Sequence, residues 1–255
     1  MSDSATFLAA AHDLADIARP IAKKYFRQPI AVYSKGDASP VTVADQEIET
    51  AMVAYLRRNF PEHGILGEEH GTHNAQAEWV WVLDPIDGTK SFITGRATFG
   101  TLIALAHWGK PMIGIIDQPI TEERWVGCAG KISTFNGKPC NVRPQVPLNE
   151  VIAATTTPAQ WTNDWPAHQR FTQNVKSMIY GGDCYSYGML ACGFVDVIAE
   201  ADLKPYDFMA LVPVVHGAGG VMTDWAGAPL SIASEGKVLA ASGADVLAQA
   251  VALLG

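Results

Sequence analysis

The sequence has few cysteines and no pattern that would use them together. Four occur in 255 residues, Cys128, Cys140, Cys184 and Cys192, and none belongs to a CxxC pair. A chain of this length with so few cysteines is not built on a disulfide framework, and a structural zinc site has no supporting spacing. We therefore expect a reducing compartment, the cytoplasm.

Long apolar runs and an excess of basic charge are also absent. No uninterrupted apolar stretch of about 18 residues suggests a membrane span, and the first segment, MSDSATFLAAAHDLADIARP, lacks the features of a signal peptide. The formal net charge is −8. Nucleic-acid binding uses basic surface, so we expect neither nucleic acid nor a membrane as a partner. An anionic ligand would need metal ions to hold it.

The hydrophobic content of 48% is ample for one large domain or two smaller ones. Helical spacing of apolar residues predicts a helix over 5–27, and a loop-like stretch follows at 34–42. A second helix, capped by Thr42 or Asp45, should end at Pro61. Short apolar runs between 78 and 129 predict successive strands of a buried sheet, and Asn136-Gly137 indicates a tight hairpin.

The second half of the chain alternates between strand and helix patterns. The polar stretch VRPQVPLNE, which carries two prolines, suggests a boundary between units 1–142 and 143–255. Beyond it the pattern predicts helices that include 207–218 and 244–254, with strands between them. The sequence therefore predicts an α/β fold with helices layered on a sheet.

A pair of carboxylates stands at the end of one predicted strand, in VLDPIDGTKS (82–91). Pro85 stiffens the turn between Asp84 and Asp87, and two carboxylates held close repel unless a proton or a cation intervenes. Oxygen ligands without nearby His or Cys favour Mg²⁺ over Zn²⁺. Gly88 permits close backbone approach, and the N–H groups of Gly88 and Thr89 could bind an anion. A metal beside an anion cradle suggests phosphate chemistry.

Two further acidic features support this hypothesis. Glu68-Glu69 ends another strand-like run, where a solvated face explains the pair poorly. Asp207 precedes an apolar helix, so it could be a helix cap, a metal ligand or both.

Four motifs in this order resemble the inositol monophosphatase superfamily: GDASPVTVAD (36–45), GEEHG (67–71), DPIDGTKSF (84–92) and PYDFMALVPVVHGAGG (205–220). The resemblance covers nearly the whole chain, although the aromatic residue before the last aspartate, often Trp in the family, is Tyr206 here. It implies the αβαβα sandwich of the inositol monophosphatase and fructose-1,6-bisphosphatase type. It also implies a magnesium-dependent, lithium-sensitive phosphatase that is a homodimer.

The resemblance assigns roles to individual residues. Glu68, Asp84 and the Ile86 carbonyl would hold one magnesium ion. Asp84, Asp87 and Asp207 would hold a second, and a third ion would touch Glu68 through water. Thr89 with Asp45 would orient and deprotonate the attacking water, as in two-metal hydrolysis.

The sequence around these motifs resembles the histidinol-phosphate phosphatase branch, so the predicted substrate is L-histidinol phosphate. Asp183, Glu200 and the neighbouring Gly182 fall where the family contacts the alcohol part of the substrate. Carboxylates there would favour an ammonium group over a neutral polyol. A helix cap is the alternative for Asp183, and a surface charge is the alternative for Glu200.

Other readings stay open. Inositol 1-phosphate, 3′-phosphoadenosine-5′-phosphate and fructose 1,6-bisphosphate are the alternative substrates, and a binding protein on an inactive phosphatase scaffold is the alternative outside enzymes. Lys35 could act electrostatically or lie in a solvated loop. Arg96 could contact phosphate or form a structural ion pair. His63, His70 and His73 fit a loop better than a zinc motif.

Overall fold

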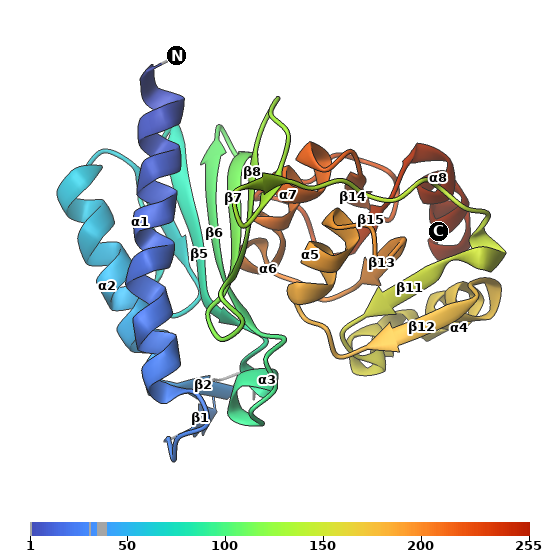
Figure 1. The fold of residues 1–255 in the computed structure, drawn as a ribbon, viewed down its shortest axis with the longest axis horizontal. Coiled ribbons are helices and arrows are strands. Elements are labelled where there is room, and N and C mark those ends of the chain that lie inside the picture. The colour runs from blue at the N-terminus through green and yellow to red at the C-terminus, as the bar shows by residue number, and fades with distance from the viewer. Residues whose placement is uncertain (1, 31, 35–39) are drawn as a thin grey trace.

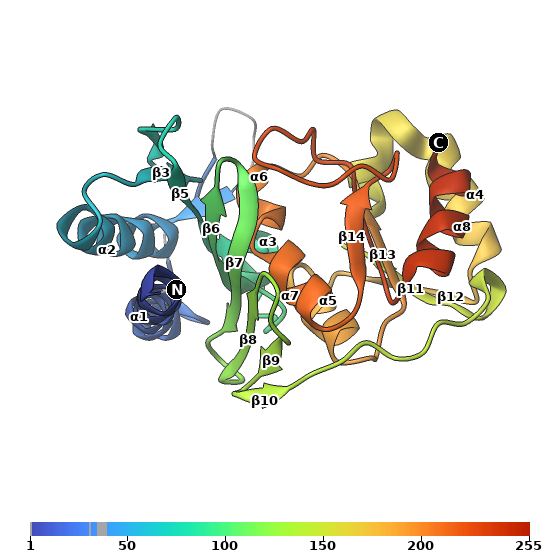
Figure 2. The same cartoon turned by 90° about the horizontal axis from the view of Figure 1, so that it is seen from above.

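The computed structural model describes residues 2–30, 32–34 and 40–255 as five stacked layers. Helices α1 and α2 cover one face of a large sheet, and helices α5, α6 and α7 lie between this sheet and a second, smaller one (Figure 1). Helices α4 and α8 cover the outer face of the second sheet (Figure 2). The predicted αβαβα sandwich is therefore confirmed.

The large sheet has eight strands in the order β10-β9-β8-β7-β6-β5-β3-β4, and all neighbours are antiparallel except β3 and β5. Its strands are β3 (Gly64–Gly67), β4 (Gly71–His73), β5 (Trp79–Asp87), β6 (Gly100–His107), β7 (Lys110–Gln118), β8 (Glu123–Cys128), β9 (Thr134–Phe135) and β10 (Lys138–Pro139). The central strands are buried along most of their length, as their apolar runs predict.

Helices α1 (Ser2–Tyr25) and α2 (Val43–Asn59) pack on this sheet through an apolar stripe. Leu14 and Ala18 of α1 and Ile48 of α2 are fully buried there. Thr42 is the N-cap of α2, and Asp45, three residues on, completes a capping box. Both candidate caps thus act together.

The second sheet follows the order β12-β11-β13-β15-β14, with β11 parallel to both of its neighbours. Its strands are β11 (Ile152–Thr155), β12 (Ser177–Tyr180), β13 (Val197–Glu200), β14 (Val221–Asp224) and β15 (Val238–Ala241). The chain passes from one sheet to the other between residues 139 and 152, and the division into units 1–142 and 143–255 stays a prediction. Among the described helices, none has the length and apolar character needed to cross a bilayer.

The remaining helices connect these strands. They are α3 (Thr89–Ile93), α4 (Trp165–Asn174), α5 (Tyr185–Ala191), α6 (Pro205–Phe208), α7 (Leu211–Gly217) and α8 (Ala244–Leu254), with 3₁₀ helices at Leu148–Glu150 and Pro158–Asp164. The predicted helix over 207–218 is wrong in one respect, because it begins at Pro205 and breaks between Phe208 and Leu211. Pro213 has no N–H to donate to the Met209 carbonyl, which explains the break.

The predicted loop over 34–42 also needs correction. Strands β1 (Val32–Ser34) and β2 (Pro40–Thr42) form an antiparallel pair, so the strands extend into both ends of this stretch. The nearby turn residues predicted a loop. Val41 and Thr42, however, are β-branched, and β-branched residues favour extended backbone. Lys35, and most of the motif over 36–45, lie outside the described residues. The Asn136-Gly137 hairpin is confirmed, since both residues have positive φ.

Helix α7 approaches the large sheet so closely that two strands carry glycine at the contact. A Cβ atom on Gly114 of β7 would lie 1.9 Å from the Ala210 carbonyl oxygen. One on Gly127 of β8 would lie 2.2 Å from the Pro213 carbonyl carbon. Both positions lack room for any side chain, so the close packing of α7 on the large sheet depends on these glycines.

We predict that Gly114→Ala lowers the free energy of unfolding by about 2 kcal/mol or more, because the added methyl forces β7 and α7 apart. Urea unfolding measures this change. Lys110→Ala, at the exposed start of the same strand, is the control and should change stability by less than about 0.5 kcal/mol. Equal stability of both variants would show that the close approach is not required.

Candidate active site

A cavity of about 250 Å³ opens between the large sheet and the middle helices. It gathers residues from β5, α3, α5, β13 and α6, which are far apart in the sequence. The lining residues are Glu68, Asp84, Ile86, Asp87, Gly88, Thr89, Lys90, Thr156, Thr157, Gln160, Asp183, Cys184, Tyr187, Glu200, Asp202, Leu203, Asp207 and Leu211. All predicted site residues lie here except Asp45 and Gly182.

The end of β5 brings Asp84 and Asp87 to the same cavity. Pairing with β6 is regular up to Asp84 and resumes at Asp87 after a register shift. The hydroxyl of Thr101 donates to the Pro85 carbonyl oxygen at 2.8 Å and fixes this irregular turn. A bulge re-aims side chains that a regular strand would point to alternate faces, and this explains how both carboxylates line the cavity.

Asp207 joins these two carboxylates from the middle layer. It lies in the first turn of α6, where its carboxylate accepts from the Lys204 backbone N–H at 2.6 Å. One oxygen each of Asp84, Asp87 and Asp207 lie within 4.8 Å of one another. The helix-cap and ligand hypotheses for Asp207 are therefore geometrically compatible.

The electrostatics of this trio fit a hard cation. Burial, followed by the charges of Glu68 and Asp87, raises the pKa of Asp84 well above its usual range. Burial also raises the pKa of Asp87 well above its usual range and that of Asp207 to about 7. Asp84 Oδ1 is buried and has no hydrogen-bond partner among the described residues. A bound divalent cation would neutralise these charges and occupy that oxygen.

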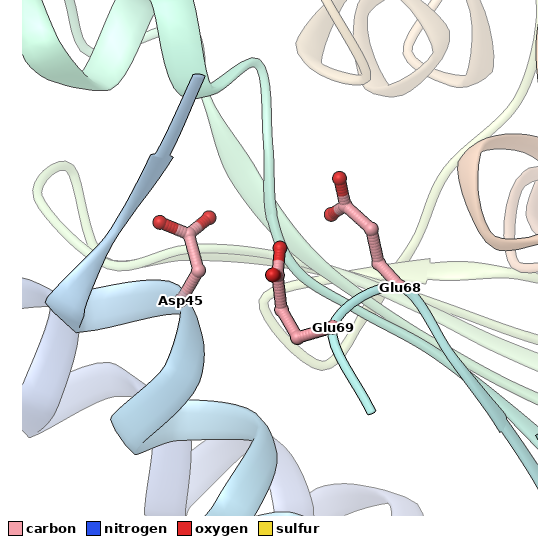
Figure 3. Close-up of side chains that lie close together, drawn as sticks. All are labelled: Asp45, Glu68 and Glu69. Atoms are coloured by element: carbon pink, nitrogen blue, oxygen red, sulfur yellow. The ribbon is translucent and has the colours of Figure 1, made fainter. Parts of the chain in front are cut away.

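A second acidic cluster lies beside the first. Asp45 projects from the start of α2, and Glu68 and Glu69 project from the segment after β3, with one oxygen each within 4.8 Å (Figure 3). Burial raises the pKa of Asp45 to about 7, against two hydrogen bonds from Thr42. Glu68 also lines the cavity and acts electrostatically on Asp84, so it stands between the two clusters.

Glu49 supports the loop that carries Glu68, and the sequence interpretation missed it. Its side chain is fully buried and accepts from the backbone N–H groups of Glu69 and His70, both at 2.8 Å. The ring of His70 lies 3.1 Å from the same carboxylate. A charged residue on the inner face of α2 was the available signal, since such residues are rarely buried without partners.

Gly88 and Thr89 form the turn between β5 and α3. Gly88 has φ 83°, which glycine adopts without strain. The Thr89 hydroxyl donates to the Ile86 carbonyl oxygen at 3.2 Å, while Asp45 bonds to Thr42. Each of the two side chains thus bonds to a residue three positions away, and their joint action on the attacking water stays a prediction.

Asp183 and Glu200 form the opposite wall of the cavity. Asp183 Oδ2 accepts from the Ser91 and Thr98 hydroxyls at 2.6 and 3.1 Å. Glu200 accepts from the Thr156 backbone N–H at 2.9 Å and from the Tyr187 hydroxyl at 2.8 Å.

All of these hydrogen-bond donors are neutral, although the charges of Arg96 and Lys90 also act on Asp183 and favour its ionised form. Burial raises the pKa of both side chains. Glu200 is 4% exposed, so the surface-charge alternative for it is wrong. The cap alternative for Asp183 also fails, because Cys184 is the residue at the N-cap of α5.

The structure shows other protein groups in contact with several of the remaining candidate residues. Gly182 lies outside the cavity lining, and its carbonyl accepts from the Ser186 N–H at 3.2 Å, so its contact with substrate stays a prediction. Arg96 donates to the Gly181 carbonyl oxygen at 3.2 Å. His63 accepts from the Trp81 indole N–H and packs among aromatic rings, and His73 is exposed. The sequence interpretation assigned no role to Lys90, Thr156, Thr157 or Gln160, which also line the cavity.

We predict that Glu49→Ala lowers the free energy of unfolding by about 2 kcal/mol or more, because it removes a buried carboxylate that accepts from the backbone N–H groups of Glu69 and His70. It should also speed hydrogen exchange at the Glu69 and His70 amides. Glu47→Ala, on the more exposed side of the same helix, is the charge-matched control and should destabilise the fold less than Glu49→Ala does. Unchanged exchange at both amides would contradict a supporting role for Glu49.

The sequence of this chain is similar to those of known phosphatases. The family model described as "Inositol monophosphatase family" matches residues 3–254. A bifunctional phosphatase IMPL2 of Arabidopsis thaliana is 46% identical over 96% of this chain and 74% of its own. A histidinol-phosphatase of Chlorobaculum parvum is 33% identical over 91% of each chain.

Solved structures give the same result. An inositol monophosphatase from Zymomonas mobilis superposes with a TM-score of 0.92 at 43% identity, covering 100% of this chain and 99% of its own. The matches in sequence and in fold show that the chain belongs to the inositol monophosphatase family, a family of metal-dependent phosphatases.

Proposed function

We propose that the protein is a magnesium-dependent phosphomonoesterase that hydrolyses L-histidinol phosphate to L-histidinol and phosphate. The charge of the cavity is the observation that supports this most. Among the described residues that line it, seven are acidic and one, Lys90, is basic. A phosphate ester cannot enter such a site without cations, and a substrate that carries its own positive charge suits the remaining acidic wall.

The two acidic clusters suit magnesium because their donors are oxygens. Asp84, Asp87 and Asp207 would hold one ion, and Glu68, Asp84 and the Ile86 carbonyl would hold a second. Glu68 would also approach a third through water. Bound magnesium would supply the positive charge that activates water and neutralises the phosphate group.

The protein's own groups then act on the water and the phosphate. Thr89 and Asp45 would orient the water and accept its proton, for which Asp45 retains a buried oxygen, Oδ1, without a hydrogen-bond partner among the described residues. The backbone N–H groups of Gly88 and Thr89 would hold phosphate oxygens. Glu49 would keep Glu68 in place through the following backbone.

The opposite wall would select the alcohol. L-Histidinol phosphate presents an ammonium group and an imidazole, whereas inositol phosphate presents hydroxyls. Asp183 and Glu200 are held by neutral donors, so their charge remains available to the ammonium group. Histidinol-phosphatases of Chlorobaculum parvum and Mycobacterium tuberculosis, at 33% identity each, agree with this choice.

Inositol 1-phosphate is the second candidate substrate, because the Zymomonas mobilis structure at 43% identity is an inositol monophosphatase. The alternative substrates 3′-phosphoadenosine-5′-phosphate and fructose 1,6-bisphosphate are less suited, because each would bring a second phosphate group into an acidic cavity. A homodimer inhibited by lithium remains the expectation from family resemblance, and a cytoplasmic location remains the expectation from the cysteine content.

We predict that phosphate release from L-histidinol phosphate has a kcat/KM at least about tenfold higher than release from inositol 1-phosphate, since the ammonium group gains about 1.5–3 kcal/mol from a charged partner. A phosphate-release assay with both esters measures this. Protein treated with EDTA is the control and should release phosphate from neither. A preference for the inositol ester would overturn the substrate assignment.

We predict that Asp183→Asn lowers kcat/KM for L-histidinol phosphate by about tenfold or more, while the value for p-nitrophenyl phosphate changes by less than about twofold. Asparagine keeps the side-chain size and can bond to Ser91 and Thr98. Asp202→Asn is the matched control, because Asp202 also lines the cavity but its side chain is 77% exposed. Equal losses for both esters would mean that Asp183 is only structural.

A further inference from the structure

Two cysteines that are distant in sequence meet outside the catalytic cavity. Cys140 follows β10, and Cys192 ends α5. The two segments lie side by side, because a Cβ atom on Gly193 would lie 3.3 Å from the Asn141 carbonyl oxygen. Both line a surface cavity of about 340 Å³ together with Phe135, Lys138, Pro139 and Asn141. The two cysteines therefore share one surface cavity that a small oxidant can enter.

The surroundings distinguish the two thiols. Trp125 donates its indole N–H to Cys192 Sγ at 3.2 Å, which stabilises a negative charge on that sulfur. The hydrogen bond from Cys140 lowers the pKa of Cys192 to about 7, and the same contact raises the pKa of Cys140 above its usual range. Cys192 is thus the better nucleophile, and Cys140 is placed to react with it afterwards.

The other two cysteines lack this arrangement. Cys128 and Cys184 are buried, and Cys184 lies in the catalytic cavity, where burial raises the pKa of its thiol well above the usual range. The buried Cys184 thiol of raised pKa therefore reacts slowly with oxidants, and Cys128 does not line the cavity that Cys140 and Cys192 share. Cys140 is also buried, but it lines that cavity beside Cys192. Cys140 and Cys192 are therefore the reactive pair among the four.

Helix α5 connects this pair to the catalytic cavity. At its first end the Cys184 backbone N–H donates to Asp87 Oδ2 at 2.6 Å, and in its middle Tyr187 donates to Glu200. Cys192 lies at the C-terminal end of the helix. The helix spans only Tyr185–Ala191, so a covalent bond at Cys192 acts within two turns of both cavity contacts.

We propose that Cys140 and Cys192 form a peroxide-responsive thiol pair whose disulfide lowers phosphatase activity through α5. This rests on the phosphatase function proposed above. The Cys192 thiolate attacks one peroxide oxygen, so its sulfur becomes a sulfenic acid and the other oxygen leaves as water after protonation. Cys140 sulfur then attacks that sulfenic sulfur and releases a second water. Two thiols and one hydrogen peroxide thus give one disulfide, with a sulfur–sulfur bond of about 2.05 Å, and two waters.

Peptide mapping of the full-length protein after hydrogen peroxide treatment tests the bond directly. We expect a Cys140–Cys192 linked peptide that dithiothreitol removes. In Cys140→Ser a sulfenic acid should accumulate on Cys192 and react with dimedone. Absence of the linked peptide from oxidised wild-type protein would overturn the proposal, whatever the substrate of the enzyme proves to be.

Hydrolysis of p-nitrophenyl phosphate tests the coupling to the cavity. Peroxide should lower the wild-type rate by at least about twofold, and dithiothreitol should restore it. Cys192→Ser should retain its rate under peroxide, and Cys128→Ser, the matched control, should respond like the wild type. Equal loss in Cys192→Ser, or a disulfide that leaves the wild-type rate unchanged, would overturn the coupling. Absence of hydrolysis before oxidation would contradict the phosphatase function itself and leave the mapping result intact.

Discussion

Mutual repulsion of carboxylates that line one cavity is the constraint on which the rest of the site depends. Asp84, Asp87 and Asp207 place oxygens within 4.8 Å of one another, and burial raises the pKa of each. Such an arrangement is stable only if rigid neighbours hold it and a cation or proton compensates it. The hydrogen bonds to the turn after Asp84 and to the first turn of α6 provide that rigidity.

The layered fold is what lets these charges converge. Asp84 and Asp87 come from the end of β5 in the large sheet and Asp207 from α6 in the middle layer. Glu200 comes from the end of β13, the central strand of the second sheet. The middle helices touch both sheets, and glycines in β7 and β8 allow their close approach. A functional cavity therefore forms where the layers meet, and the packing of α7 determines its geometry as much as the acidic residues do.

The sequence predicted the parts of the site that local chemistry determines. The turn at DPIDG and the hairpin at Asn136-Gly137 each depend on backbone preferences of a few adjacent residues, so they are readable without tertiary structure. Glu49 was missed because its value comes from backbone N–H groups twenty residues away. The neutral donors around Asp183 and Glu200, and the contact between Cys140 and Cys192, likewise require long-range packing that no local pattern encodes.

Thermal unfolding of EDTA-treated protein during a magnesium titration tests the central claim that the carboxylates are arranged for a divalent cation. Binding to the folded state alone adds about 2.7 kcal/mol at a hundred times Kd. The account predicts a saturable rise in Tm for the wild type and little or none for Asp84→Asn, with sodium chloride at matched ionic strength as the control. A Tm that magnesium and sodium raise equally, or that rises alike in both proteins, would contradict it.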